Sequence, residues 1–88
     1  MGCASDALDA AEIELNQIYR RALAALDEDG KKRLRTAQRS WLTFRDAEAG
    51  LERHRSGEGG SLGGLIFLNR KLDLTLTRIA DLKRIASP

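Results

Sequence analysis

Side chains that commonly carry out catalysis are scarce in this chain and far apart. His54 is the one histidine and Cys3 the one cysteine, and no HExxH, CxxC or paired-carboxylate spacing is present. Ser40, Ser56 and Ser61 lack the sequence context of a nucleophile. We therefore predict that the protein is not an enzyme and has no catalytic, metal or cofactor site, and we expect His54 to be solvated at a helix end.

Five cations gather in one short stretch: Lys31, Lys32, Arg33, Arg35 and Arg39. Cations at a helix N-terminus oppose the helix dipole, so something should compensate them. The acidic run 27–29 directly before the cluster would do so and would make it a neutralised surface corner. The alternative is a site for an acidic partner or nucleic acid. Nucleic acid is the weaker choice, because no aromatic residues interleave with the cations.

The segment from Ser56 to Gly64 holds five of the eight glycines. Glycine loops that hold phosphate have a defined spacing, usually a lysine, and a preceding strand. None of these features occurs here. We therefore expect a flexible connector without a role in cofactor binding.

Length and composition predict a single helical domain spanning residues 1–88. A chain of 88 residues buries too little surface for two cores. The hydrophobic fraction of 42% and charged fraction of 32% are those of a folded amphipathic protein, and the alanine- and leucine-rich, valine-free composition favours helix. The net charge is only +2, and no stretch is long and apolar enough to span a bilayer.

Apolar residues recur every three or four positions in three stretches, which predicts helices over residues 4–26, 31–55 and 65–86. The predicted inward residues of the first are Leu8, Ala11, Leu15, Ile18, Ala22 and Leu26. Those of the second are Leu34, Ala37, Trp41, Phe44, Ala47 and Leu51. Those of the third are Leu65, Leu68, Leu72, Leu76, Ile79, Leu82 and Ile85. Gly50 is expected at a close helix contact or a bend.

The predicted fold class is all-α, an elongated antiparallel three-helix bundle, because the three helices have matched lengths. The short connection after the first helix predicts that the first two helices are antiparallel neighbours. The third helix is also apolar outside its main stripe, at Ile66, Phe67 and Leu74. Either these residues fold back over the connector, or they form a surface that pairs with a partner or with a second copy in a homodimer.

Two motifs resemble those of a known family. The first is LN-x-x-Y at residues 15–19, and the second is AQ-x-x-W-x-x-F-RD at residues 37–46. With the glycine-rich segment and Thr75-x-x-Arg78-x-x-x-Leu82, they resemble the bacterial family of the LprI lysozyme-inhibitor N-terminal domain over about residues 3–82. The resemblance implies a non-catalytic binding module of the bacterial envelope, with lysozyme as the protein partner. Structural self-association and, more weakly, nucleic-acid binding through residues 31–39 are the alternative functions.

The resemblance also implies a periplasmic or secreted protein. Members of the family usually carry several cysteines, but here Cys3 alone matches them, while Ala49 and residues 69–71 stand where others are common. Because the disulfides that would support an extracytoplasmic location are missing, a cytoplasmic location stays an alternative. Gly2-Cys3-Ala4-Ser5 would suit a lipid-acceptor cysteine, so a lipid anchor at Cys3 is a further hypothesis.

The polar motif residues have two interpretations. Interhelical hydrogen bonds or ion pairs would explain Asn16, Tyr19, Gln38, Arg45, Asp46, Thr75 and Arg78 without a ligand. Trp41 and Phe44 would supply most of the aromatic area of the core. As a recognition surface, Arg45 and Arg78 are the residues we expect to meet carboxylates. If the protein blocks lysozyme, the connector would enter the enzyme cleft with Glu58 and Ser61 as its polar tips.

Overall fold

Three α-helices make up the part of the chain that the computed structural model describes, residues 3–87. They are α1 (Cys3–Ala24), α2 (Glu28–Ser56) and α3 (Gly60–Ala86), and no strand occurs within the described range. The molecule measures 45 × 22 × 16 Å. The predicted all-α, elongated three-helix bundle is confirmed.

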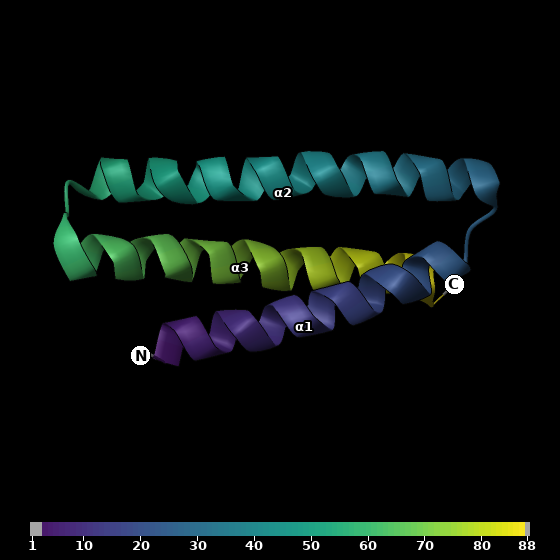
Figure 1. Cartoon of the computed structure of the whole chain (residues 1–88), viewed down its shortest axis with the longest axis horizontal. Helices are drawn as coiled ribbons and strands as arrows, with labels where there is room; N and C mark the ends of the chain where they lie inside the picture. Colours follow the sequence, from purple (N-terminus) through teal and green to yellow (C-terminus); the bar gives the residue numbers. More distant parts are fainter. Residues whose placement is uncertain (1–2, 88) are drawn as a thin grey trace.

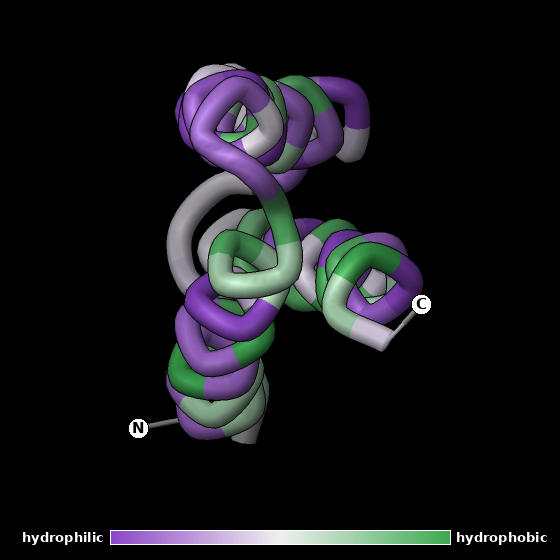
Figure 2. Tube along the Cα trace, turned by 90° about the vertical axis from the view of Figure 1, so that its right-hand side faces the viewer, coloured by the Kyte–Doolittle hydropathy of each residue, from purple (hydrophilic) through white to green (hydrophobic). Residues whose placement is uncertain are grey.

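The central helix is α3, which packs against both others, whereas α1 and α2 make few contacts with each other. Figure 1 shows α2 running antiparallel along α3 and α1 crossing α3 on the other side, and the end-on view in Figure 2 places α2 apart from α1 and α3. The prediction that α1 and α2 pack as neighbours is therefore wrong. The reason is the wide apolar arc of α3: Phe67 and Leu74 are half-buried on the side where Arg70 and Lys71 pair with α2, so α3 holds two neighbours.

The core lies mainly between α1 and α3. In α1 the predicted stripe is confirmed, with the buried residues Leu8, Ala11, Leu15, Ile18 and Ala22. From α3, Ile79 and Leu82 are buried, and Trp41 of α2 is half-buried against the same cluster. Leu65 and Leu76 were predicted to face inward, but they are 43% and 49% exposed at the edge of α3.

The inward face of α2 differs from the predicted one. Its buried residues are Leu34, Gln38, Arg45 and Ala49. The predicted inward residues Ala37, Phe44, Ala47 and Leu51 are exposed. Moving the inward face on by one residue rotates the helix by about 100°. The rotation is favourable because Gln38 and Arg45 find hydrogen-bond partners on other helices, and buried polar groups are stable only when they are so paired.

Both ends of α2 have well-formed caps. The Asp27 side chain accepts a hydrogen bond from the Gly30 N–H at 2.8 Å, so the helix begins three residues before the predicted position 31. At the other end Gly57 has φ of 71°, and its N–H donates to the His54 carbonyl at 3.1 Å. The left-handed conformation suits glycine, so this residue stops the helix.

The glycine-rich segment is helical from Gly60 onward, which leaves only residues 57–59 between α2 and α3. The prediction of a flexible connector over residues 56–64 is therefore wrong. A Cβ on Gly63 would lie 2.5 Å from the Glu58 carbonyl oxygen and 2.8 Å from Arg53 Nε. Glycine at this position permits the close approach that starts α3. At Gly50 nothing lies within 4 Å of an added Cβ, so the predicted close contact there is also wrong.

No helix within residues 3–87 is long and apolar enough to cross a membrane. The lipid-anchor hypothesis concerns Met1, Gly2 and the Cys3 side chain, all of which lie outside the part of the structure that is described.

Two alanine substitutions in adjacent glycines test the close approach at the start of α3. Gly63→Ala should lower the free energy of unfolding by about 1–3 kcal/mol, because the new Cβ collides with backbone. Gly64→Ala meets no atom within 4 Å and should raise it by about 0.5–1 kcal/mol, as alanine favours helix. Urea unfolding followed by circular dichroism measures both. Equal effects of the two changes would contradict this packing.

Candidate functional site

A buried arginine joins all three helices at the middle of the bundle. Arg45 of α2 is 4% exposed, and its Nη1 donates to Glu12 Oε2 of α1 at 2.9 Å. Its Nε donates to Asp46 Oδ1 at 3.0 Å. The same Nη1 lies 3.4 Å from Oγ1 of Thr75 of α3, which is fully buried and donates to the Lys71 carbonyl at 2.7 Å. The guanidinium is therefore held by charge-assisted hydrogen bonds within the molecule.

A second arginine, Arg78 of α3, is satisfied less completely. Its Nε donates to Gln38 Oε1 at 3.0 Å, while its Nη2 is buried and has no hydrogen-bond partner among residues 3–87. Desolvation by burial lowers the pKa of Arg78, and the charge of Asp81 opposes this shift. Because an arginine starts from so high a pKa, the side chain remains a cation at neutral pH.

Both guanidiniums lie close to the one tryptophan. The Cζ atoms of Arg45 and Arg78 are 5.3 Å and 6.0 Å from the centroid of the Trp41 ring. Cation–π attraction of this kind strengthens when the cation has lost water. Trp41 thus stabilises two charges as well as adding apolar area, which explains why it faces inward while Phe44 does not.

The gap between α1 and α2 forms an open groove. It has a volume of about 270 Å³ and is lined by Leu15, Asn16, Tyr19, Arg35, Gln38, Arg39 and Leu42. None of these residues is acidic. Four of them, Leu15, Asn16, Tyr19 and Gln38, are defining residues of the motifs identified in the sequence, so these motifs meet at the wall of one groove.

The predicted partner-binding residues fall in two separate places. Arg45 and Arg78 lie in the polar network inside the bundle, where they meet Glu12, Asp46 and Gln38. Glu58 and Ser61 are exposed where α2 turns into α3. We call residues 53–62, all exposed, the hairpin tip. In Figure 1 this tip projects beyond the start of α1.

The basic cluster is neutralised only in part. Lys31 Nζ lies 3.1 Å from Glu28 Oε2, and Arg33 Nε lies 2.9 Å from Asp29 Oδ2, as predicted for the acidic run before it. Arg35 and Arg39 form no salt bridge with any described residue and stand at the groove instead. No cluster of side chains that could hold a metal ion occurs in the described part of the chain.

Sequence reasoning missed Glu12 and the groove. Glu12 lies directly after the inward residue Ala11, and this charge at the edge of an apolar stripe is the sequence feature that could have indicated it. The groove has no comparable signal, since it depends on α1 and α2 being held apart by α3.

Comparison with known proteins identifies the family. The model of the family described as lysozyme inhibitor LprI matches residues 1–82. The chain belongs to the LprI lysozyme inhibitor family. An uncharacterised protein of Rhizobium meliloti is 30% identical over 96 residues, an alignment that covers 94% of this chain and 68% of the relative. No solved structure gives a significant match.

The LprI family match covers both motifs and the whole polar network. Arg45, Asp46, Gln38, Thr75 and Arg78 all lie within residues 1–82. The first interpretation of these residues, interhelical hydrogen bonds and ion pairs, agrees with the contacts of Arg45 and Arg78.

A double-mutant cycle tests the Arg45–Glu12 ion pair. Glu12→Gln should lower the free energy of unfolding by about 1–2 kcal/mol, because it leaves a buried guanidinium undercompensated. Combining it with Arg45→Met should cost less than the sum of the single changes, since the buried charge is then gone.

The matched control is Glu14→Gln, also in α1. Its partner Lys83 lies 3.4 Å away, but the side chains of Lys83 and Glu14 are 54% and 47% exposed. A pair so exposed contributes less than about 0.5 kcal/mol. An effect of Glu14→Gln as large as that of Glu12→Gln would show that burial of Arg45 is not what makes its ion pair matter.

Proposed function

We propose that this protein is a non-catalytic binding module of the bacterial envelope that inhibits lysozyme by inserting its hairpin tip into the enzyme's cleft. The observation that carries the proposal is the match of residues 1–82 to a family described as a lysozyme inhibitor. A periplasmic or secreted location is part of the proposal, since lysozyme acts on the cell wall outside the cytoplasm.

The shape of the hairpin tip supports this use. Glycosidases act in a cleft with two carboxyl groups beside the scissile bond, so a rigid element that fills the cleft excludes the substrate. The tip is the narrow end of two packed helices. It exposes donors and acceptors of several kinds, among them the guanidinium of Arg55, the carboxylate of Glu58 and the hydroxyl of Ser61.

Local hydrogen bonds hold the tip in one conformation. Ser56 Oγ donates to the Arg53 carbonyl at 2.6 Å and accepts from the Glu58 N–H at 3.2 Å. Arg53 Nη2 lies 3.5 Å from the Gly60 carbonyl across the turn. A preorganised tip loses little conformational entropy on binding, which favours inhibition by a small protein.

A lytic assay tests the proposal. The purified protein, at about tenfold molar excess over lysozyme, should slow the clearing of bacterial cell walls by more than about half. Glu58→Ala/Ser61→Ala should raise the concentration needed for half inhibition about fivefold or more, because the tip loses two contacts.

The matched control is Glu28→Ala/Ser40→Ala, which removes the same groups from exposed positions of α2 outside the tip. It should leave inhibition within about twofold of the wild type. Undiminished lysis with the wild-type protein would reject inhibition. Inhibition equally strong in both double variants would reject the tip as the contact surface.

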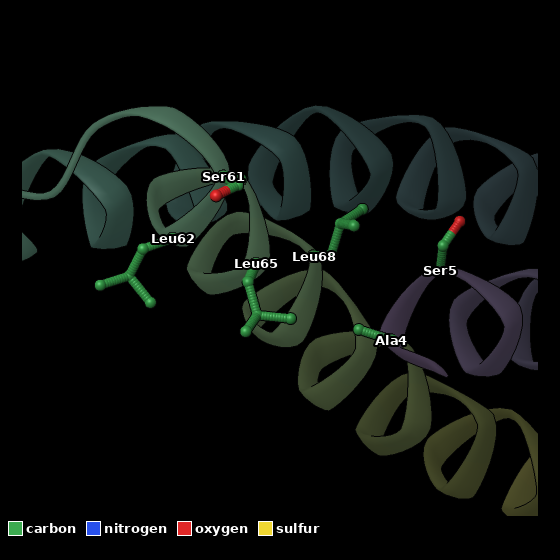
Figure 3. Close-up of a pocket in the computed structure, with 7 residues that line it drawn as sticks. Ala4, Ser5, Ser61, Leu62, Leu65 and Leu68 are labelled. Atoms are coloured by element: carbon green, nitrogen blue, oxygen red, sulfur yellow. The ribbon is translucent and has the colours of Figure 1, made fainter. Parts of the chain in front are cut away.

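Self-association is a second candidate, favoured by an apolar hollow between the starts of α1 and α3. The hollow has a volume of about 550 Å³ and is lined by Ala4, Ser5, Ser61, Leu62, Gly64, Leu65 and Leu68. In Figure 3, Leu62 and Leu65 project beside it, and they are 50% and 43% exposed. Because projecting leucines and a hollow share one patch, a second copy related by a two-fold axis could fill each hollow with the other's leucines.

Light scattering tests self-association. The wild type should show a mass above that of the 9.7 kDa monomer at high concentration, and the double variant Leu62→Asp/Leu65→Asp should show the monomer mass. These leucines are a better probe than Phe67, which is half-buried with Lys71 Nζ 5.4 Å from its ring. The control is Ile13→Asp, because Ile13 is 62% exposed but outside the hollow. A monomeric wild type would reject this candidate.

A further inference from the structure

The groove between α1 and α2 carries positive charge that no carboxylate of its wall compensates. Arg35 and Arg39 stand one turn apart on α2, both exposed, and neither forms a salt bridge within residues 3–87. Like charges at this spacing cost a few tenths of a kcal/mol in a helix. Of the other surface arginines, four are paired with an acid three or four residues away or on another helix: Arg33, Arg55, Arg70 and Arg84. Arg20, Arg21 and Arg53 also form no salt bridge within residues 3–87, but they stand outside the groove wall.

The rest of the wall offers further hydrogen-bond donors. The Gln38 oxygen must face Arg78, because a guanidinium only donates, so the Gln38 amide group remains available as a donor. Asn16 and Tyr19 add an amide and a phenol from the α1 side. Leu15 and Leu42 supply apolar surface that reduces hydration, which strengthens any charged contact beside it.

A third cation lies directly behind this wall. Arg78 donates to the groove residue Gln38, and its Nη2 is buried without a hydrogen-bond partner in the described part of the chain. The positive charge at the groove therefore comes from the two guanidiniums at its rim, with Arg78 behind Gln38 and partly offset by the charge of Asp81. An anion in the groove would compensate the two rim charges directly.

We propose that this groove binds a carboxylate-rich peptide segment of a partner protein. The planar fork of a guanidinium matches a carboxylate, and a volume of about 270 Å³ admits one or two acidic side chains. Nucleic acid is disfavoured because the wall holds a single aromatic residue, Tyr19, whereas single-strand binders stack successive bases. The groove is separate from the hairpin tip, and this binding does not depend on lysozyme inhibition.

Titration of the full ¹⁵N-labelled chain with acetylated tetraglutamate at low salt tests the proposal by NMR. Shifts should concentrate at Asn16, Tyr19, Gln38 and the two rim arginines, with a Kd of roughly 0.1–1 mM. Arg35→Gln/Arg39→Gln should raise the Kd about tenfold. Raising the salt to about 0.3 M should weaken binding, since the rim charges are exposed.

The matched control is Arg20→Gln/Arg21→Gln, which removes the same charge from exposed positions of α1 outside the groove wall. It should leave the Kd within about twofold of the wild type. Equal losses in both variants, or shifts spread over the surface, would overturn the proposal by showing general attraction. Tighter binding of an oligothymidylate than of tetraglutamate at the same residues would overturn it in favour of nucleic acid.

Discussion

The burial of one guanidinium constrains the whole bundle. Arg45 is charged and almost fully enclosed, so it must find acceptors, and it finds them on α1 through Glu12 and on α3 through Thr75. An uncompensated buried charge costs several kcal/mol, whereas mispaired apolar residues cost much less. The rotation of α2, the position of Trp41 and the exposure of Phe44 all follow from placing Arg45 where these acceptors converge.

The same arrangement determines which surfaces are open. Since α3 is apolar on two sides, it separates α1 from α2 and leaves their facing flanks uncovered. One polar motif residue therefore serves twice: Gln38 holds Arg78 on one side and lines the groove on the other. At the end of the molecule, Gly63 lets α3 begin almost at once after α2, so the tip is short and firmly held instead of long and flexible.

Hydrophobic periodicity predicted the fold class and the inward stripe of α1 correctly, because every inward position of that helix is aliphatic. It failed for α2, where counting apolar residues selects Ala37, Phe44 and Leu51, while the buried positions belong to Gln38 and Arg45. Burial of polar residues depends on partners from other helices, which periodicity within one helix cannot show. For the same reason the family motifs indicated polar packing, but Glu12 and the groove emerge only once the helices are placed together.

The inward face of α2 also sets how firmly that helix is attached. Leu34 is its one large aliphatic buried residue, while Gln38 and Arg45 hold it by directional bonds that are lost together once the helix moves. Local opening is easiest where few apolar contacts must be broken, so we expect α2 to open before the α1–α3 pair. A ligand that bridged α1 and α2 would restrict this opening. Because the hairpin tip is continuous with α2, the ligand would also restrict the movement of the tip at the opposite end of the molecule.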